Sequence, residues 1–178
     1  MKNLDRYTNE GRKFIAEEKE TARLVERHLQ SKNGGASFKL DLAALGDAEN
    51  FDAYIYKEGE KIGVCEIKSR DYFNRKKGTR FTWDLFEKFG YLITAAKIDT
   101  IREECLLNGI NGYIFVNLLN ERKIVCIHVC DAKGELLIDY KIRKTKTKYS
   151  CNNSKGDTYR DNAFIPIKGN CQVKTFKY

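Results

Sequence analysis

The order of apolar and polar positions predicts a helix and then strands in the first part of the chain. Residues 9–30 are rich in charge and carry apolar side chains at helical spacing, and a glycine pair follows them. Residues 38–42 alternate apolar and polar side chains, which fits a short strand or a loop. Residues 53–56 and 62–67 are β-branched and aromatic runs joined by a polar turn with Gly59, so they predict a hairpin.

The second half of the chain continues this alternation. Residues 82–97 carry an apolar helical face, with Thr82 as a candidate cap, and residues 98–107 continue or restart that helix. Residues 112–119 and 123–129 are apolar runs bounded by turns, as central strands are. Residues 163–167 look like a short returning strand. The pattern therefore predicts an α/β fold with a central mixed sheet flanked by helices.

Composition favours one globular domain over residues 1–178. The chain has 178 residues, of which 42% are hydrophobic and 33% charged, enough for one core and too few for two domains. It contains no run of 18 apolar residues, so we expect no membrane span. The first residues lack an apolar signal-peptide region, and we expect a cytoplasmic protein.

Net charge adds an expectation about the partner. The chain carries +8 at pH 7 with a pI near 9.1, which favours a polyanion. Basic residues gather after residue 68 and again in a C-terminal segment, 141–160, which has seven Lys or Arg and one Asp. The candidate phosphate contacts are Arg70, Arg75, Lys76, Lys77, Arg80, Lys144, Lys146 and Lys148. Alternating lysines also protect an edge strand from aggregation, so the C-terminal segment has a structural explanation as well.

Three charged residues interrupt the apolar hairpin. Asp52 opens its first strand, while Glu66 and Lys68 lie two residues apart on the second and therefore project to one face, about 6.6 Å apart along the strand. Two carboxylates and a nearby backbone carbonyl form an oxygen-rich site that suits Mg²⁺ or Mn²⁺. A neighbouring ammonium can orient an attacking water or stabilise charge on a phosphate. Exposed Glu-x-Lys alternation is also common on solvated strands, which is the structural alternative.

Asp52, thirteen intervening residues and then Glu66-Ile67-Lys68 at the end of an apolar strand resemble the PD-(D/E)XK nuclease superfamily. Phe51 stands where the name of that superfamily has Pro. The resemblance implies a restriction-endonuclease-like core and a Mg²⁺- or Mn²⁺-dependent endodeoxyribonuclease. By the same resemblance, Asp52, Glu66 and the Ile67 carbonyl would bind metal and Lys68 would position water.

The resemblance also implies a glutamate on the first helix and a Lys or Gln on the helix after the motif strand. Glu18 is the candidate glutamate because it falls in the middle of the apolar stripe of residues 9–30, where a carboxylate needs a partner or a metal. Pairing with an arginine would explain Glu18 equally well, and Glu17 and Glu20 are alternatives. Lys88 is the matching position on the later helix, and a surface role explains it as well.

Other residues that could bind metal or act in catalysis are less favoured or have structural explanations. Asp41, Asp47 and Glu49 precede the hairpin, but Asp52 is preferred because it directly opens the apolar strand. His128 lies inside a predicted strand, which favours a structural histidine. The six cysteines are Cys65, Cys105, Cys126, Cys130, Cys151 and Cys171, and they contain no Cys-x-x-Cys pair. Reduced thiols are therefore expected rather than zinc or disulfides, and Cys65, Cys105 and Cys126 have the apolar neighbours of buried thiols.

We therefore expect a metal-dependent nuclease that acts on DNA and grips backbone phosphates. By analogy with the family, a small member without a recognition module could be structure-selective, like a junction resolvase, and homodimeric. A non-catalytic nucleic-acid-binding module of the same fold and an RNA-directed nuclease are the alternatives. An α/β interaction protein whose Glu-x-Lys has no catalytic role is a further one.

Overall fold

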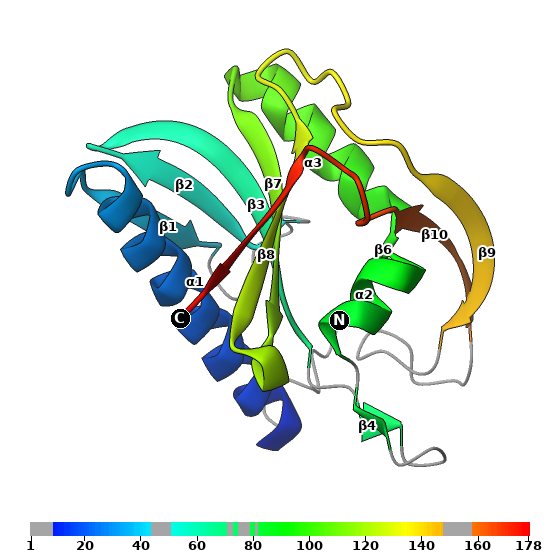
Figure 1. Cartoon of the computed structure of the whole chain (residues 1–178). Coiled ribbons are helices and arrows are strands. Elements are labelled where there is room, and N and C mark those ends of the chain that lie inside the picture. The colour runs from blue at the N-terminus through cyan, green and yellow to red at the C-terminus, as the bar shows by residue number, and fades with distance from the viewer. Residues whose placement is uncertain (1–8, 44–50, 71–72, 75–78, 81, 148–157) are drawn as a thin grey trace.

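A computed structural model of the chain describes residues 9–43, 51–70, 73–74, 79–80, 82–147 and 158–178. A six-stranded sheet lies at the centre of this α/β fold (Figure 1). Its strands, in spatial order, are β1 (Phe38–Leu42), β2 (Ala53–Lys57), β3 (Glu60–Arg70), β7 (Asn111–Leu118), β8 (Lys123–Cys130) and β11 (Val173–Lys177). β3 and β7 run parallel and all other neighbours antiparallel, so the predicted mixed sheet is confirmed.

Helices cover both faces of this sheet. α1 (Asn9–Lys32) buries Val25 in one apolar cluster, together with side chains of β1, β2 and β3. α3 (Ala95–Asn108) buries Ile98 and Ile101 in the other cluster, against β7 and β8. Because parallel strands require a long crossover, the connection from β3 to β7 includes α3.

The alternation of β3 assigns its side chains to these two clusters. Cys65 and Ile67 belong to the cluster under α1, and Val64 belongs to the cluster under α3. Glu66 and Lys68 follow Val64 by two and four residues, so their side chains point to the same face of the sheet, the one that α3 covers. The expectation that Glu66 and Lys68 project together is confirmed.

The predicted hairpin is also confirmed. Lys57 pairs with Glu60, which leaves a two-residue turn of Glu58 and Gly59. Both turn residues have positive φ, 49° and 86°, as the type I′ turn of a tight hairpin requires. A one-residue register shift between Ile55 and Tyr56, typical of a β-bulge, then places Ala53 opposite Cys65, and hence Asp52 close to Glu66.

The continuous helix predicted over residues 82–97 is wrong. The chain forms α2 (Trp83–Phe89), breaks at Gly90, runs as strand β6 (Tyr91–Thr94) and starts α3 at Ala95. Gly90 adopts φ 76° and ψ −178°, a conformation that is essentially restricted to glycine. A Cβ there would lie 2.6 Å from the carbonyl oxygen of Ile165, so the close approach of the returning chain also requires glycine.

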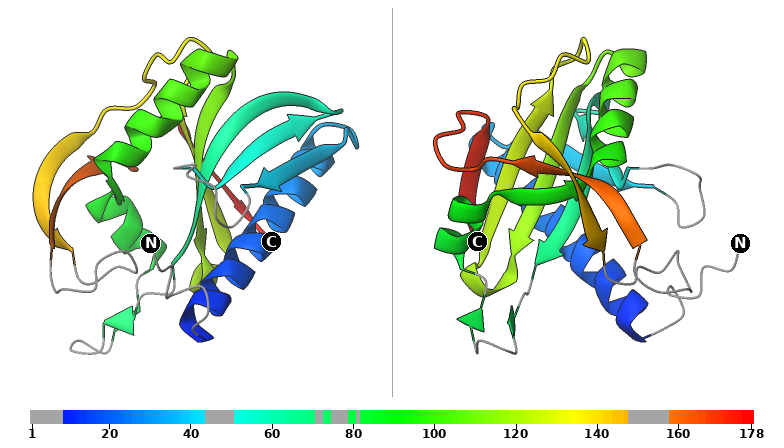
Figure 2. Two further views of the ribbon diagram at one scale, coloured as in Figure 1. Left: turned by 180° about the vertical axis from the view of Figure 1, so that it is seen from behind. Right: turned by 90° about the vertical axis from the view of Figure 1, so that its right-hand side faces the viewer.

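β6 belongs to a second sheet that the C-terminal segment completes. β10 (Thr158–Ile165) pairs with β6 on one side and with β9 (Lys141–Thr147) on the other. Figure 2 shows this second sheet beside the N-terminal end of α3. Residues 163–165 of the predicted short strand 163–167 are the end of β10, residues 166–167 lie after it, and β11 was not predicted. The short strands β4 (Phe73–Asn74) and β5 (Thr79–Arg80) pair with each other, and Leu119–Glu121 form a 3₁₀ turn.

Candidate functional site

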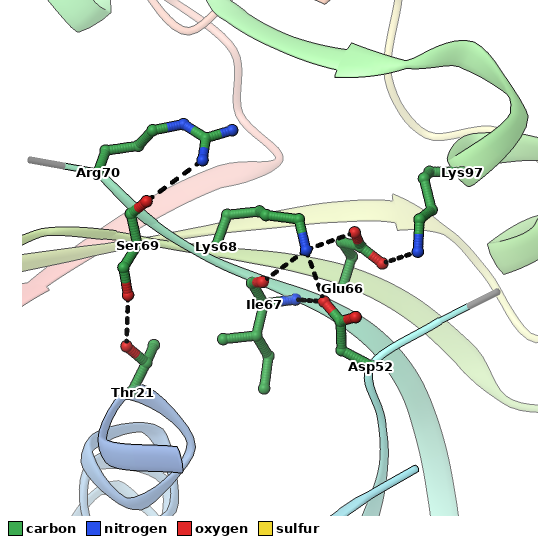
Figure 3. A network of polar contacts seen from close by, with 8 residues as sticks. All are labelled: Thr21, Asp52, Glu66, Ile67, Lys68, Ser69, Arg70 and Lys97. Carbon is green, nitrogen blue, oxygen red and sulfur yellow. Dashed lines mark hydrogen bonds and ion pairs between the residues drawn. The ribbon is translucent and has the colours of Figure 1, made fainter. Parts of the chain in front are cut away.

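The β2–β3 hairpin brings Asp52, Glu66 and Lys68 together (Figure 3). The backbone N–H of Asp52 donates to the carbonyl oxygen of Cys65 at 3.0 Å, which fixes the strand entry. The Asp52 Oδ2 atom accepts a hydrogen bond from the backbone N–H of Ile67 at 2.7 Å. The aspartate is therefore held by backbone groups of the strand that carries the other two residues.

The ammonium of Lys68 lies at the centre of three oxygens. Its Nζ is 2.9 Å from Asp52 Oδ2, 2.7 Å from Glu66 Oε1 and 3.0 Å from the carbonyl oxygen of Ile67 (Figure 3). Burial alone would lower the pKa of Lys68, but the Glu66 and Asp52 carboxylates outweigh it and raise the pKa well above its usual value. The lysine is therefore a charged group held by two carboxylate oxygens and one backbone carbonyl oxygen.

Glu66 is the most buried member of the site, with no exposed surface. Burial raises the pKa of its carboxyl, and the nearby ammonium groups of Lys68 and Lys97 oppose that effect. Lys97 Nζ donates to Glu66 Oε2 at 2.9 Å. The other oxygen, Oε1, forms an ion pair with the Lys68 ammonium at 2.7 Å. Each oxygen of this buried carboxylate therefore faces a lysine ammonium.

Glu18 of α1 joins this cluster. Burial, followed by the charge of Asp52, raises the pKa of Glu18 from 4.5 to about 7, and a hydrogen bond with Asp52 contributes. Such a bond between two carboxyl groups needs a shared proton. The other two candidates lie elsewhere: Glu17 pairs with Lys13, and Glu20 pairs with Arg23 and Arg27 on the helix surface. Of the three glutamates, Glu18 is the one close to Asp52 and Glu66.

A buried polar chain holds α1 against the strands next to the site. Thr21, one turn after Glu18, has its hydroxyl 3.2 Å from the hydroxyl of Ser69, the residue after Lys68. The Asn117 side-chain amide donates to the same Thr21 hydroxyl at 3.0 Å, and the Tyr178 hydroxyl donates to Asn117 Oδ1 at 2.9 Å. Thr21 and Asn117 are buried. This network links α1 to β3 and β7 one turn away from Glu18.

The oxygens of this site are of the kind that Mg²⁺ and Mn²⁺ prefer. Carboxylates from Glu18, Asp52 and Glu66 and the Ile67 carbonyl are hard, and three of them already surround a cation, the Lys68 ammonium. Among the described residues, no group of three Asp, Glu, His or Cys side chains has the arrangement of a ready metal site. With Lys68 turned away, Asp52, Glu66 and the Ile67 carbonyl could hold the metal, because all three oxygens that now contact the Lys68 ammonium would face it.

Lys97, which the sequence did not single out, contacts Glu66, whereas Lys88 lies elsewhere. Lys88 is exposed on α2, and its Nζ lies 5.6 Å from the ring centroid of Phe89. Lys97 is in the first turn of α3, four residues before the buried Ile101, so it borders the face that packs on the sheet. The break at Gly90 separates the two lysines. An interpretation of Gly90 as the end of one helix would have placed Lys97 near the start of the next helix, and so would have made it a candidate.

Tyr91 is a second residue that the sequence did not single out. Its side chain is buried, and its hydroxyl has no hydrogen-bond partner among the described residues. Burial raises the pKa of Tyr91; the charges of Arg70 and Lys68 oppose this effect, and those of Glu66 and Asp52 add to it. The guanidinium of Arg70 lies 5.7 Å from the centroid of the Tyr91 ring. Tyr91 therefore lies between the carboxylates and the surface around Arg70.

The candidate phosphate contacts are only partly described. Arg70, at the end of β3, is half-buried, and Lys144 is exposed on β9, an edge strand of the second sheet among the described residues. Arg80 and Lys146 lie in described strands, but their side chains are not described. Arg75, Lys76, Lys77 and Lys148 lie outside the described residues.

The rival candidates occupy other positions. Asp41 is exposed and pairs with Lys39 at 2.8 Å, while Asp47 and Glu49 lie outside the described residues. His128 stacks on the ring of Tyr113 with centroids 4.7 Å apart, and burial lowers its pKa. The five described cysteines are free thiols, and Cys151 is outside the described part.

Comparisons with known proteins add no relative. Neither protein-family models, nor curated proteins, nor solved structures gave a match. Within the described part of the chain, no helix combines the length and apolar character that crossing a membrane requires.

Proposed function

We propose that the protein is a metal-dependent nuclease of the PD-(D/E)XK type that hydrolyses phosphodiester bonds in DNA. The observation that carries this proposal is the set of three oxygens around Lys68 Nζ, from Asp52, Glu66 and the Ile67 carbonyl, at 2.7–3.0 Å. These are the ligands expected of a hard divalent cation. A purely structural Glu-x-Lys pair on a strand would be exposed, whereas Glu66 is fully buried.

The fold supports the same proposal. The motif strand β3 is central, its neighbour β7 is parallel, and α1 and α3 cover opposite faces of the sheet. We propose that this arrangement is a restriction-endonuclease-like core. The second sheet, β6-β10-β9, would be an addition to that core that borders the substrate side.

Each residue of the site then has a role in hydrolysis. Mg²⁺ or Mn²⁺, when bound, would stabilise the negative charge that builds on the phosphate. Asp52, Glu66 and the Ile67 carbonyl would hold the metal, and Glu18 would complete the shell. Lys68, released from these oxygens, would orient the attacking water or donate to a phosphate oxygen as the phosphorus–oxygen bond to the leaving group breaks.

Lys97 has a separate role in this proposal. Its ammonium, 2.9 Å from Glu66 Oε2, favours the ionised form of a carboxyl that burial would otherwise keep protonated. Lys97 would therefore be a positioning residue that keeps Glu66 charged and fixed, so that Lys68 is free to move to substrate.

The basic surface would supply affinity for the nucleic-acid backbone. With a net charge of +8, binding should weaken steeply with salt and depend little on sequence. The proposal also includes selectivity for branched substrates and a homodimeric state. Both rest on analogy with the family alone.

The proposal is tested by incubating the protein with supercoiled plasmid, a four-way DNA junction and single-stranded RNA, each with Mg²⁺, Mn²⁺ or a chelator. We expect metal-dependent cutting that Glu66→Ala abolishes while binding remains. Cutting of RNA alone would favour the RNA-directed alternative. Retention of DNA without any cutting would favour the non-catalytic binding module.

A further inference from the structure

Two adjoining hollows lie next to the site, on the side of Arg70 and Tyr91. Their volumes are about 420 Å³ and 320 Å³, and they share Phe89, Gly90 and Phe164. We name the combined surface the aromatic groove and define it by Arg70, Phe89, Leu92, Arg143 and Phe164. It therefore brings together β3, α2, β6, β9 and β10.

The aromatic groove exposes apolar surface to solvent. Phe89 is 62% exposed and Leu92 is 40% exposed, although both belong to well-defined elements. Phe164 pairs with Leu92 across β6 and β10, so the two side chains share one face of the second sheet. The guanidinium of Arg143 lies 5.3 Å from the centroid of the Phe164 ring. The exposed ring of Phe89 and the half-buried ring of Phe164, next to arginines, form a surface suited to flat, apolar groups that carry negative charge.

The charge around these rings is positive. The two hollows are lined by the cations of Arg70, Lys88, Lys141, Arg143 and Lys168 and by only two acids, Glu87 and Asp139. A polyanion with exposed π faces matches both features, and a single strand of nucleic acid is such a molecule. A duplex hides its base faces in the stack, so it would leave Phe89 and Leu92 uncovered.

The aromatic groove is continuous with the proposed catalytic site. Arg70 lines it and follows Lys68 by two residues on β3, on the same face of the strand. Tyr91 also lines it, and its buried hydroxyl lies within electrostatic range of Lys68, Glu66 and Asp52. A strand lying across Phe89 and Phe164 would therefore have its backbone at Arg70 and lead toward Lys68.

We infer that the aromatic groove binds a single strand of nucleic acid, with bases on Phe89 and Phe164 and phosphates on Arg70 and Arg143. This inference rests on the proposed function, and it gives that function a substrate class. The protein would cut unpaired strands or single-stranded branches close to the point where they enter the site.

The experiment measures binding by fluorescence anisotropy with labelled oligo(dT), oligo(U) and a duplex of equal length, all in chelator so that nothing is cut. We expect both single strands to bind more tightly than the duplex. Phe89→Ala should weaken single-strand binding about tenfold, because stacking of one base is worth that much. Leu107→Ala is the matched control, since Leu107 is 78% exposed on α3 and lies outside the aromatic groove.

Phe89 is largely exposed at the end of α2, so its loss should not unfold the protein, and circular dichroism checks this. Arg143→Ala should weaken the binding of both single strands and reduce the salt dependence of that binding. Equal affinity of wild type and Phe89→Ala for oligo(dT) and oligo(U), or tighter binding of the duplex, would overturn the inference. Plasmid cutting in Mn²⁺, measured separately, would still stand in that case. Conversely, binding that depends on the aromatic groove without any cutting would overturn the proposed nuclease function, while the inferred single-strand binding site would stand.

Discussion

Lys97 Nζ lies 2.9 Å from Glu66 Oε2, a contact that joins the start of α3 to the centre of the sheet. The carboxyl is fully buried, while the lysine side chain is 31% exposed. The ammonium therefore contacts a buried charge although the lysine side chain is still partly exposed. The chain places a fixed cation on each oxygen of Glu66, because Lys68 lies 2.7 Å from Oε1.

Removing this cation should destabilise the protein. Lys97→Met keeps the length of the side chain but leaves Glu66 Oε2 buried without that partner, so we expect the free energy of unfolding to fall by about 1–3 kcal/mol. Lys88→Met is the matched control, because Lys88 is exposed and contacts Phe89 rather than the site. Urea denaturation compares the two variants. Equal stability of both with the wild type would contradict the proposed role of Lys97.

Asp52 should control metal binding. We expect calorimetry to detect Mn²⁺ binding to the wild type and to lose it in Asp52→Asn, because the amide removes a charged ligand next to Lys68. Asp41→Asn is the control, since Asp41 is an exposed carboxylate paired with Lys39. Loss of binding in Asp41→Asn, or its retention in Asp52→Asn, would contradict the ligand assignment.

Glu18 should make the metal-free protein less stable as pH rises. Its pKa is raised from 4.5 to about 7 in the folded state, so the folded chain binds this proton more tightly than the unfolded chain. The stability that the protonated Glu18 contributes is present below pH 4.5 and is lost as pH rises toward about 7. Glu18→Gln should therefore be more stable than the wild type at pH 8, by on the order of 1–3 kcal/mol.

The same comparison at pH 4.5 is the control for Glu18. There the wild-type carboxyl is protonated in the folded state and about half protonated in the unfolded state, so most of the difference between Glu18→Gln and wild type should disappear. Both measurements use urea denaturation in the presence of a chelator. A difference of the same size at both pH values would mean that the carboxylate charge is not its cause.

Gly90 should tolerate no side chain. Gly90→Ala would introduce a Cβ 2.6 Å from the Ile165 carbonyl oxygen at a φ of 76°, so both backbone strain and a clash oppose it. We expect a loss of about 2–4 kcal/mol. Gly34→Ala is the matched control, since Gly34 also has positive φ but no atom within 4 Å of the added Cβ. It should cost about 1 kcal/mol, and equal losses would show that the contact with Ile165 is unimportant.

The sequence predicted those elements whose signals are local. The helix at residues 9–32, the hairpin turn at Glu58-Gly59 and the apolar strands β7 and β8 follow from periodicity and turn chemistry. The same local signals indicated that Glu66 and Lys68 share one face and placed Glu18 on the buried stripe of α1.

The elements that the sequence did not predict depend on partners far along the chain. Residues 91–94 form a strand because β10, about seventy residues later, pairs with them, and their local pattern also suits a helix. β11 forms because it completes the edge of β8. The contact of Lys97 with Glu66 depends on where α3 begins, and the break at Gly90 decides that position.

The most direct test of the central proposal is the rate of Mn²⁺-dependent cleavage of a labelled DNA by wild type and Glu66→Gln, measured under single-turnover conditions. Glutamine keeps the size of the buried side chain and removes its charge, so the variant should still fold. Folding and DNA binding are checked on the same samples. We predict that wild type cuts, that chelator stops it and that Glu66→Gln is slower by about a thousandfold or more while still binding DNA. Cleavage by Glu66→Gln at the wild-type rate would contradict the assignment of the site.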